Sequence, residues 1–449
     1  MVNRNQISRR LAAVLLAGRW TSEALRESLK SALCPHHRKA RWIAPLAERI
    51  VSRFEASRLP PTERQLGDFL KQDELLWDKI SQYDLEEKIV IDLLALPRPE
   101  MRPGPRLPGD WQLPAIVSPG DLAAWCQVEP TELDWLADRP SRERVQRNPK
   151  LQNYHYRWLK KRSGGFRLIE EPKPRLKSIQ RQILSEILNR IPSHEAAHGF
   201  QKGRSVLSYV APHVGRHTVL HLDLRHFFPS ISRARITSLF RWVGYPEAVA
   251  NLLAGLCTNA VPGGLIGELP IPCDSEVRHQ FSKILSNPHL PQGAPTSPAL
   301  ANLAAYRLDC RLAGLARKTN VSYTRYADDL TFSGGRRFGK KMSPFRIMVC
   351  AIVIDEGFEI RRRKTRVLSK GTRQEVAGVV LNQHPNLRRD EYDRLRAILH
   401  NCQRHGPESQ NRERHERFKE HLRGRIAHHR RINPNRGEKL TRLFDQIRW

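Results

Sequence analysis

The sequence lacks the features of a protein that is stabilised by disulfides or structural zinc, or that spans a membrane. Seven cysteines are scattered over 449 residues with no C-x-x-C pair, so neither a disulfide framework nor a zinc ribbon is predicted. No apolar run approaches the length of a membrane-spanning helix. Residues 11–18 follow Arg9 and Arg10 as in a signal peptide, but the run is short, Arg19 and Trp20 follow at once, and no A-x-A cleavage pattern is present. We therefore expect a reduced, cytoplasmic protein with no membrane partner.

Acidic residues are scarce relative to basic ones. The chain has 46 Asp and Glu against 77 Lys and Arg, a formal net charge of +31. An excess of this size favours a polyanionic partner. Nucleic acid is the expected one. An anionic membrane is the alternative, and it would require an apolar anchor or a strongly amphipathic surface helix.

The first part of the chain is predicted to be a helical accessory domain over residues 1–96. Apolar residues recur there at helical spacing, and Thr62 followed by Gln65 is the signature of a capping box. A linker is predicted over residues 97–117, because residues 97–114 contain six prolines and two glycines. No residue before the linker carries recognisable chemistry.

An acidic pair interrupts two extended runs at residues 322–333, which read S-Y-T-R-Y-A-D-D-L-T-F-S. The pattern predicts a hairpin whose turn carries Ala327, Asp328 and Asp329. Turns favour Asp in any case, so a plain loop is the alternative for this stretch taken alone.

A third carboxylate stands at the end of an apolar run. Residues 219–224, V-L-H-L-D-L, predict a buried strand that ends at Asp223. A carboxylate in this position is costly to bury unless it is paired or binds a metal. A helix cap or a surface aspartate is the alternative. The three aspartates together form the candidate acidic site.

Two further stretches suit contact with a nucleotide. Residues 156–169 predict a hairpin with the basic, glycine-bearing turn K-K-R-S-G-G, where the backbone can approach a phosphate; a solvated surface turn is the alternative. Residues 290–298, L-P-Q-G-A-P-T-S-P, are predicted to open a helix whose N-terminus receives anions. Between them, we expect a helix over residues 237–256 and an inserted loop over residues 261–289. A short strand is expected at residues 376–382, with Gly378 allowing another backbone to approach.

These motifs, taken in order, resemble the reverse transcriptases of bacteria, and most closely the retron-type enzymes. The set that carries the resemblance is K-R-S-G-G-F-R-L-I, A-H-G-F-x-x-G-R-S, L-D-L-R-H-F-F-P-S-I, L-P-Q-G-A-P-T-S-P, Y-T-R-Y-A-D-D-L-T-F-S, a K-T pair and V-A-G-V-V-L-N. It covers roughly residues 118–449. Two elements depart from the family: its N-A-x-x-H reads Y-V-A-P-H at residues 209–213, and its V-T-G reads V-A-G at residues 376–378.

The resemblance implies an α+β fold of the right-hand polymerase type. Fingers and a palm with an antiparallel sheet would occupy residues 118–385, and a helical, basic thumb residues 386–449, after the N-terminal helical domain. The acidic site would bind two Mg²⁺ ions, with Mn²⁺ as a substitute. Asp223 and Asp328 would be the principal ligands and Asp329 a less direct one.

Nucleotide contacts are likewise implied by the resemblance. Phe228 would lie below the incoming sugar and exclude a 2′-hydroxyl, although an ordinary core aromatic is the alternative. Arg167 and Lys161 would neutralise the triphosphate of a dNTP, and Gln292 would hold the nucleotide. Lys364 would be a phosphate contact or a general acid toward pyrophosphate.

RNA contacts are expected in the family's recognition elements and in the thumb: Arg204, His213, Gly378, Arg423 and Arg425. The implied function is to copy a structured noncoding RNA into single-stranded DNA that stays bound to it, in defence against phage. An effector protein could dock on the N-terminal domain. The first alternative is a defence-associated reverse transcriptase with a non-retron template. The second is an enzyme of the group II intron type, which we disfavour because no maturase or nuclease domain has room after the thumb. The third is an RNA-binding scaffold with an inactive polymerase fold, which the intact aspartates disfavour.

Overall fold

The computed structural model describes residues 4–17, 20–32, 41–54, 61–82, 100–101, 111–161, 166–267 and 275–449. The chain forms two compact units. Unit 1 comprises Met1–Ile191 and Ile231–Ser297, and unit 2 comprises Pro192–Ser230 and Pro298–Trp449. The secondary structure is mixed, with helices and antiparallel sheets, so the predicted α+β class is confirmed.

Unit 1 begins with a group of amphipathic helices packed on a leucine-rich core that includes Leu11, Leu25, Leu46 and Leu66. These helices are α1 (Arg4–Ala17), α2 (Ser22–Ala32), α3 (Ile43–Phe54), α4 (Glu63–Gln72) and α5 (Glu74–Gln82). The predicted capping box is present, because the Thr62 side chain and Gln65 satisfy each other's backbone amides at the start of α4. Most of the proline-rich linker, namely residues 97–99 and 102–110, lies outside the described residues.

The remainder of unit 1 combines a β-hairpin with helices. These elements are α6 (Pro119–Cys126), α7 (Pro130–Ala137), β1 (Tyr154–Lys160), β2 (Phe166–Pro172), α8 (Pro174–Glu186), α10 (Arg233–Val243), α11 (Glu247–Cys257), α12 (Gly263–Gly267) and α13 (Ser275–Leu285). Strands β1 and β2 pair in antiparallel register; residues 162–165 of the predicted basic turn lie outside the described part.

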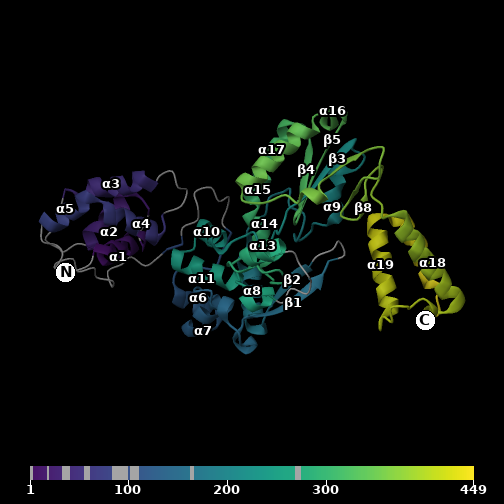
Figure 1. The fold of residues 1–449 in the computed structure, drawn as a ribbon, viewed down its shortest axis with the longest axis horizontal. Coiled ribbons are helices and arrows are strands. Elements are labelled where there is room, and N and C mark those ends of the chain that lie inside the picture. The colour runs from purple at the N-terminus through teal and green to yellow at the C-terminus, as the bar shows by residue number, and fades with distance from the viewer. Residues whose placement is uncertain are drawn as a thin grey trace. The chain divides into compact units, whose positions relative to one another are not determined.

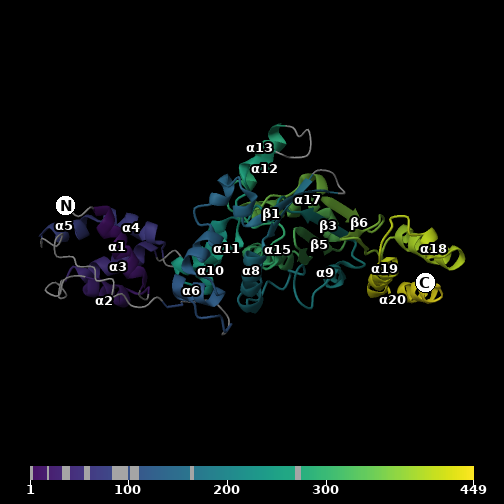
Figure 2. The same ribbon diagram turned by 90° about the horizontal axis from the view of Figure 1, so that it is seen from below.

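Two sequence expectations in unit 1 are wrong. The single helix expected over residues 237–256 is broken at Gly244, whose φ of 121° ends α10 before α11 begins. The loop expected over residues 261–289 contains α12 and α13 (Figure 2). Ile266 and Leu285 from these helices are buried against Leu168 of β2. Packing of these scattered apolar residues therefore stabilises the helices, although the sequence shows no clear helical periodicity there.

Unit 2 is built around a four-stranded antiparallel sheet in the order β4-β5-β3-β6. The strands are β3 (Thr218–Asp223), β4 (Ser322–Tyr326), β5 (Asp329–Gly334) and β6 (Arg366–Ser369). The helices of this unit are α9 (Val206–Val210), α14 (Ser297–Ala304, whose first residue belongs to unit 1), α15 (Tyr306–Lys318), α16 (Arg336–Lys340), α17 (Met342–Asp355), α18 (Arg389–His405), α19 (Phe418–Ile432) and α20 (Pro434–Asp445). Phe332 of β5 stacks on Tyr323 and meets Phe345 of α17, and Figure 1 shows α15 and α17 together along this side of the sheet.

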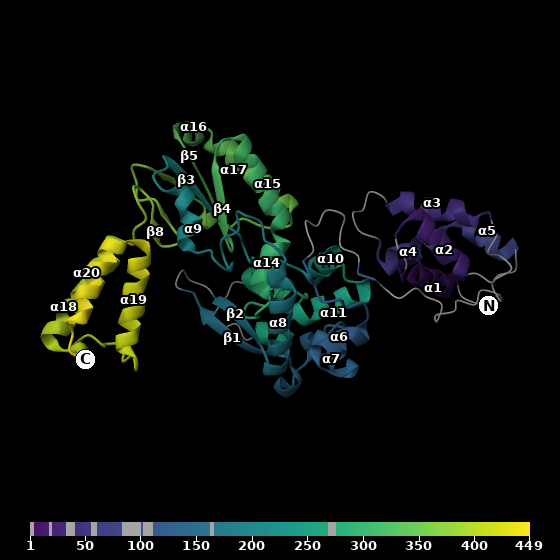
Figure 3. The same cartoon turned by 180° about the vertical axis from the view of Figure 1, so that it is seen from behind.

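The last part of unit 2 begins with a tight hairpin and ends in three packed helices. Strands β7 (Glu375–Val376) and β8 (Val379–Val380) are joined by Ala377 and Gly378, with φ values of 49° and 79°. In the described part of the chain, nothing lies within 4 Å of where a Cβ on Gly378 would be, so this glycine serves the left-handed turn and not the close approach that we expected. Helices α18 and α20 lie side by side (Figure 3).

Along the described ranges, we find no helix that combines the length and the apolar composition needed to cross a membrane.

Candidate active site

The pairing of β3 with β5 brings the three aspartates together. Asp223, the last residue of β3, is opposite Asp329, the first residue of β5. Asp328 lies in the turn before β5, and its carbonyl oxygen accepts a hydrogen bond of 2.8 Å from the amide of Leu224. Ala327 makes the turn possible by adopting a φ of 53°. A run that is apolar up to Asp223 and a turn that carries two acids therefore converge at one end of the sheet.

The carboxylates destabilise one another's charge. Burial raises the pKa of Asp328 to about 6, and the neighbouring Asp329 and Asp223 add to the rise. Asp223 is only 2% exposed. Its Oδ2 lies 2.6 Å from Nζ of Lys364, and its Oδ1 lies 3.5 Å from Nε of Arg361. Asp223, the most buried of the three acids, therefore already has two cationic side chains beside it.

The donor set fits a hard divalent cation. Although Arg361 lies 3.5 Å from it, the buried Oδ1 of Asp223 accepts no hydrogen bond within the described part of the chain, which is unusual for a carboxylate oxygen unless a metal ion completes it. Carboxylate oxygens are the ligands that Mg²⁺ prefers. As the side chains stand, no three potential metal ligands among the described residues converge on one point. Lys364 holds Asp223 instead, so binding of an ion would require this ion pair to open.

A buried network supports the acidic turn from the other face of the sheet. Arg325 and Asp309 are both 0% exposed and form a bidentate ion pair, with Nη2–Oδ2 at 2.6 Å and Nε–Oδ1 at 2.8 Å. Nη1 of Arg325 also donates to Asn302 and to the carbonyl oxygen of Ala327 in the turn. Burial alone would lower the pKa of Arg325, but Asp309 outweighs it and the net shift is upward. Sequence reasoning missed this pair, because one charge on a helix and one on a strand give no signal of mutual burial.

Gly199 holds the loop before β3 against the same turn. A Cβ on this residue would lie 2.7 Å from the amide nitrogen of Ala327. The Gly199 carbonyl oxygen accepts a hydrogen bond of 2.8 Å from Asn302. The glycine in the H-G-F stretch is therefore required for backbone contact with the acidic turn.

The residues expected to contact the nucleotide fall in both units. In unit 2, Phe228 is half-buried against Phe227 and Phe200, and Lys364 is the partner of Asp223. In unit 1, Arg167 is exposed on β2, and Lys161 directly follows β1.

Gln292 lies in a loop that is fixed to β2. Its carbonyl oxygen accepts from the amide of Glu170 at 2.9 Å. Gly293 follows with a φ of 139°, and a Cβ there would lie 2.8 Å from the carbonyl oxygen of Glu170. A buried ion pair of Glu170 with His289, at 3.0 Å, anchors the start of the same loop, so the backbone that presents Gln292 is held closely.

His213 requires a correction among the expected RNA contacts. It is 0% exposed, and its ring nitrogens lie 2.7 Å from the hydroxyls of Ser333 and Thr324. Burial lowers its pKa to about 3. His213 therefore has no atom available to RNA, and instead ties the segment after α9 to strands β4 and β5.

The other expected RNA contacts differ in how far other groups of the protein already engage them. Arg204 donates to the carbonyl oxygen of Glu195 at 2.8 Å and lies against His198, while Gly378 is exposed in its turn. On α19, the guanidinium of Arg423 lies over the ring of Phe444. Burial lowers the pKa of Arg425, and repulsion from Arg394 adds to the shift.

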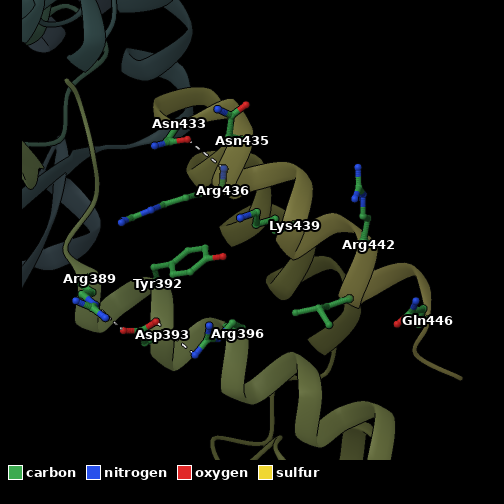
Figure 4. A pocket seen from close by; sticks show the side chains of 11 residues that line it. Arg389, Tyr392, Asp393, Arg396, Asn433, Asn435, Arg436, Lys439, Arg442 and Gln446 are labelled. Carbon is green, nitrogen blue, oxygen red and sulfur yellow. Dashed lines mark hydrogen bonds and ion pairs between the residues drawn. The ribbon is translucent and has the colours of Figure 1, made fainter.

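A basic hollow that sequence reasoning did not single out lies between α18 and α20. Its volume is about 640 Å³, and Figure 4 shows the side chains that line it. We call it the C-terminal pocket, and its lining residues are Arg389, Tyr392, Asp393, Arg396, Asn433, Asn435, Arg436, Lys439, Arg442, Leu443 and Gln446. The guanidinium of Arg436 lies 5.0 Å from the centre of the Tyr392 ring. Within the described ranges, neither Arg436 nor Lys439 has an acidic partner at ion-pair distance, whereas Arg442 is paired with Glu438.

Comparison with known proteins agrees with this geometry. Residues 159–389, which include all three aspartates, match the family described as reverse transcriptase (RNA-dependent DNA polymerase). The retron Mx65 reverse transcriptase of Myxococcus xanthus is 41% identical over 331 residues, 74% of this chain and 72% of that protein. The retron Mx162 enzyme of the same organism is 40% identical over 56% of this chain and 52% of its own, and the retron Ec86 enzyme of Escherichia coli is 32% identical over 52% and 65%.

These matches define the class of protein as a nucleic-acid polymerase that uses an RNA template. The chain belongs to the reverse transcriptases, and within them to the bacterial retron type. It is an RNA-directed DNA polymerase, with an RNA template and dNTPs as its substrates. Reverse transcriptase domains in general use divalent metal ions, typically Mg²⁺.

Proposed function

We propose that this enzyme copies a structured noncoding RNA into single-stranded DNA that remains bound to the RNA, and that it acts in defence against phage. The observation that carries the catalytic part is the convergence of Asp223, Asp328 and Asp329 at one end of a sheet. Oδ1 of Asp223 is buried there and accepts no hydrogen bond from the described residues. The similarity to retron enzymes supports the choice of template.

In this mechanism Asp223 and Asp328 would be the principal ligands of two Mg²⁺ ions, or of Mn²⁺ in their place, and Asp329 would be the less direct ligand. When bound, the ions would activate the attacking hydroxyl and stabilise charge on the transferring phosphate. Lys364, freed from Asp223, is then placed to contact phosphate or to protonate pyrophosphate. The ion pair seen here supports an exchange of one cation for another at the most buried carboxylate.

Nucleotide selection is assigned to four side chains. Phe228 would lie below the sugar and exclude a 2′-hydroxyl; its half-buried position among Phe227 and Phe200 gives the ring a fixed site. Arg167 and Lys161 would neutralise the triphosphate, and Gln292 would hold the nucleotide from its anchored loop.

The architecture that we propose is a right hand: fingers from about residue 154, a palm formed by the four-stranded sheet, and a thumb from about residue 386. The domain limits 1–96, 97–117, 118–385 and 386–449 are part of the same proposal. In the thumb, Arg423 and Arg425 would contact the RNA backbone. Helices α1 to α5 have a leucine-rich core of their own, which supports an accessory role such as docking an effector protein.

The C-terminal pocket extends the proposed RNA surface. Five of its side chains are Arg or Lys and one is Asp, so it would attract a phosphodiester. The Arg436 guanidinium lies over the ring of Tyr392, and a guanidinium plane can stack on an unpaired base. The pocket therefore supports contact with RNA backbone and with an unstacked nucleotide.

The direct test is polymerisation by the purified full chain with an RNA template, a primer, dNTPs and Mg²⁺. We expect wild-type protein to make DNA and Asp328→Ala plus Asp329→Ala to make none. DNA synthesis by the double variant would overturn the site assignment. Sequencing the nucleic acid that copurifies tests the template: DNA joined to or paired with one structured RNA is expected, and a mixture of unrelated RNAs would favour the non-retron or intron-type alternatives.

A further inference from the structure

One imidazole at the acidic site has no part in the chemistry described above. His221 lies on β3 two residues before Asp223, and alternation along a strand puts both side chains on the same face. In the pairing with β5, His221 is opposite Thr331 while Asp223 is opposite Asp329. His221 and Asp329 are therefore diagonal neighbours across the two strands, a separation that a long side chain can bridge.

The contact between these two residues is close but incomplete. Nε2 of His221 lies 3.0 Å from Oδ1 of Asp329, which is the distance of a hydrogen bond. Nε2 is nevertheless buried and has no aligned hydrogen-bond partner anywhere in the described ranges. The two groups are thus within reach, and a rotation of either side chain would complete the bond.

His213 shows what a purely structural histidine looks like on the same face of this sheet. Both of its ring nitrogens lie 2.7 Å from hydroxyl groups. Buried polar atoms are nearly always satisfied in this way. The open Nε2 of His221 is therefore not explained by packing alone, and the acceptor that it faces is a carboxylate of the candidate metal site.

We propose that His221 is a positioning residue for the metal site: its Nε2–H bonds to one oxygen of Asp329 and leaves the other oxygen free to bind a cation. This inference rests on the proposed function, in which Asp223, Asp328 and Asp329 bind divalent ions. Hydrogen bonds to ligand carboxylates fix their orientation, and loss of such partners typically lowers metal affinity about 10- to 100-fold.

The position of Lys364 explains why an imidazole suits this task. The Lys364 ammonium binds Asp223 directly at 2.6 Å, so it competes with a metal ion for the carboxylate. An imidazole N–H uses only one edge of Asp329 and can stay in place when an ion arrives. Lys364 is thus expected to leave on metal binding, and His221 to remain.

The test measures the dissociation constant of Mn²⁺ for the purified full chain without nucleic acid. Electron paramagnetic resonance reports the concentration of the free ion. We expect His221→Ala to raise the dissociation constant about tenfold, and His221→Gln, which keeps an N–H donor, to return it to within about twofold of wild type. His217→Ala is the matched control, because this histidine immediately precedes β3 and contacts Thr218; it should leave the constant unchanged. Thermal unfolding in EDTA checks that each variant is folded.

The outcomes separate this inference from the proposed function. If His221→Ala binds Mn²⁺ within twofold of wild type, or if His221→Gln is no better than His221→Ala, the positioning role is wrong. If Asp328→Ala plus Asp329→Ala binds Mn²⁺ as wild type does, the metal site itself has been misassigned. Loss of Mn²⁺ binding in the aspartate variant, together with weaker Mn²⁺ binding by His221→Ala, supports both the metal site and the positioning role of His221.

Discussion

At the acidic site, buried carboxylates are paired with cationic side chains, whereas in the C-terminal pocket cations are gathered on helix surfaces. Two of the pocket cations, Arg436 and Lys439, lack an acidic partner in the described structure. Asp223 is 2% exposed and meets Lys364, and the turn beside it rests on the fully buried pair of Arg325 and Asp309. Arg442 and Glu438, at the edge of the pocket, are 73% and 62% exposed. Chemistry at a phosphate needs a few groups in fixed positions, while contact with an RNA backbone needs many cations and little precision.

The largest effect expected from this contrast is on stability. Arg325→Met should lower the free energy of unfolding of unit 2 by about 3–5 kcal/mol, because it leaves Asp309 buried without its partner. Arg442→Ala, which breaks an exposed pair, should change it by less than about 1 kcal/mol. Thermal or denaturant unfolding of the full chain measures both.

A second variant separates the charge from the packing. Arg325→Met combined with Asp309→Leu should recover much of the loss, since a buried pair can be replaced by apolar side chains of similar size. DNA synthesis should recover less than stability does, because Arg325 also donates to the carbonyl oxygen of Ala327 in the acidic turn. Full recovery of both would show that the pair does not shape the site.

These two regions also show what could be predicted from the sequence. An apolar run that ends in Asp223 and extended runs around Asp328 predicted strands close to the observed β3, β4 and β5. The register that sets Asp223 opposite Asp329 depends on packing between segments a hundred residues apart, so the sequence could indicate convergence but not distances. The burial of Arg325 with Asp309 could not be predicted from the neighbouring sequence, because it also depends on packing between separate segments.

Errors arose where a residue's role depends on what covers it. His213 was expected to contact RNA because it stands in a recognition element, but packing of its segment onto β4 and β5 buries it completely. Gly378 was expected to permit close approach, and instead it permits a left-handed turn. The C-terminal pocket was missed because cations from α18 and α20 adjoin only when the helices pack.

A smaller effect concerns the pH dependence of stability at the acidic site. Because the pKa of Asp328 is raised from 3.8 to about 6, the folded protein binds this proton more tightly than the unfolded chain does. Stability should therefore fall as pH rises from about 4 through about 6 and stay lower above that range. Asp328→Asn should stabilise the metal-free protein at pH 7.5 by up to about 3 kcal/mol, with no gain near pH 4, while it abolishes DNA synthesis.

The matched control is in the pocket. Asp393 is 41% exposed and lies near Arg389 and Arg396, so Asp393→Asn should change stability by less than about 1 kcal/mol, and in the destabilising direction. Unfolding temperatures in EDTA across pH 4 to 8 measure both variants. Equal pH profiles for Asp328→Asn and wild type would mean that neither burial nor the neighbouring acids raise the pKa of Asp328 in the folded protein.

The smallest expected effect is on RNA affinity, and it tests whether the pocket is a site or part of a diffuse positive field. Arg436→Ala plus Lys439→Ala should weaken binding to a structured RNA about tenfold at moderate salt and reduce the slope of log affinity against log salt by about 1.5 to 2, because two phosphate contacts are lost. Arg430→Ala plus Arg431→Ala removes the same charge from exposed positions on α19 that do not line the pocket. A smaller loss in this control would indicate a localised site, whereas equal losses in the two variants would show that only net charge matters there. Synthesis on a homopolymer template with its primer should be nearly unchanged in both, since the acidic site keeps all of its buried partners.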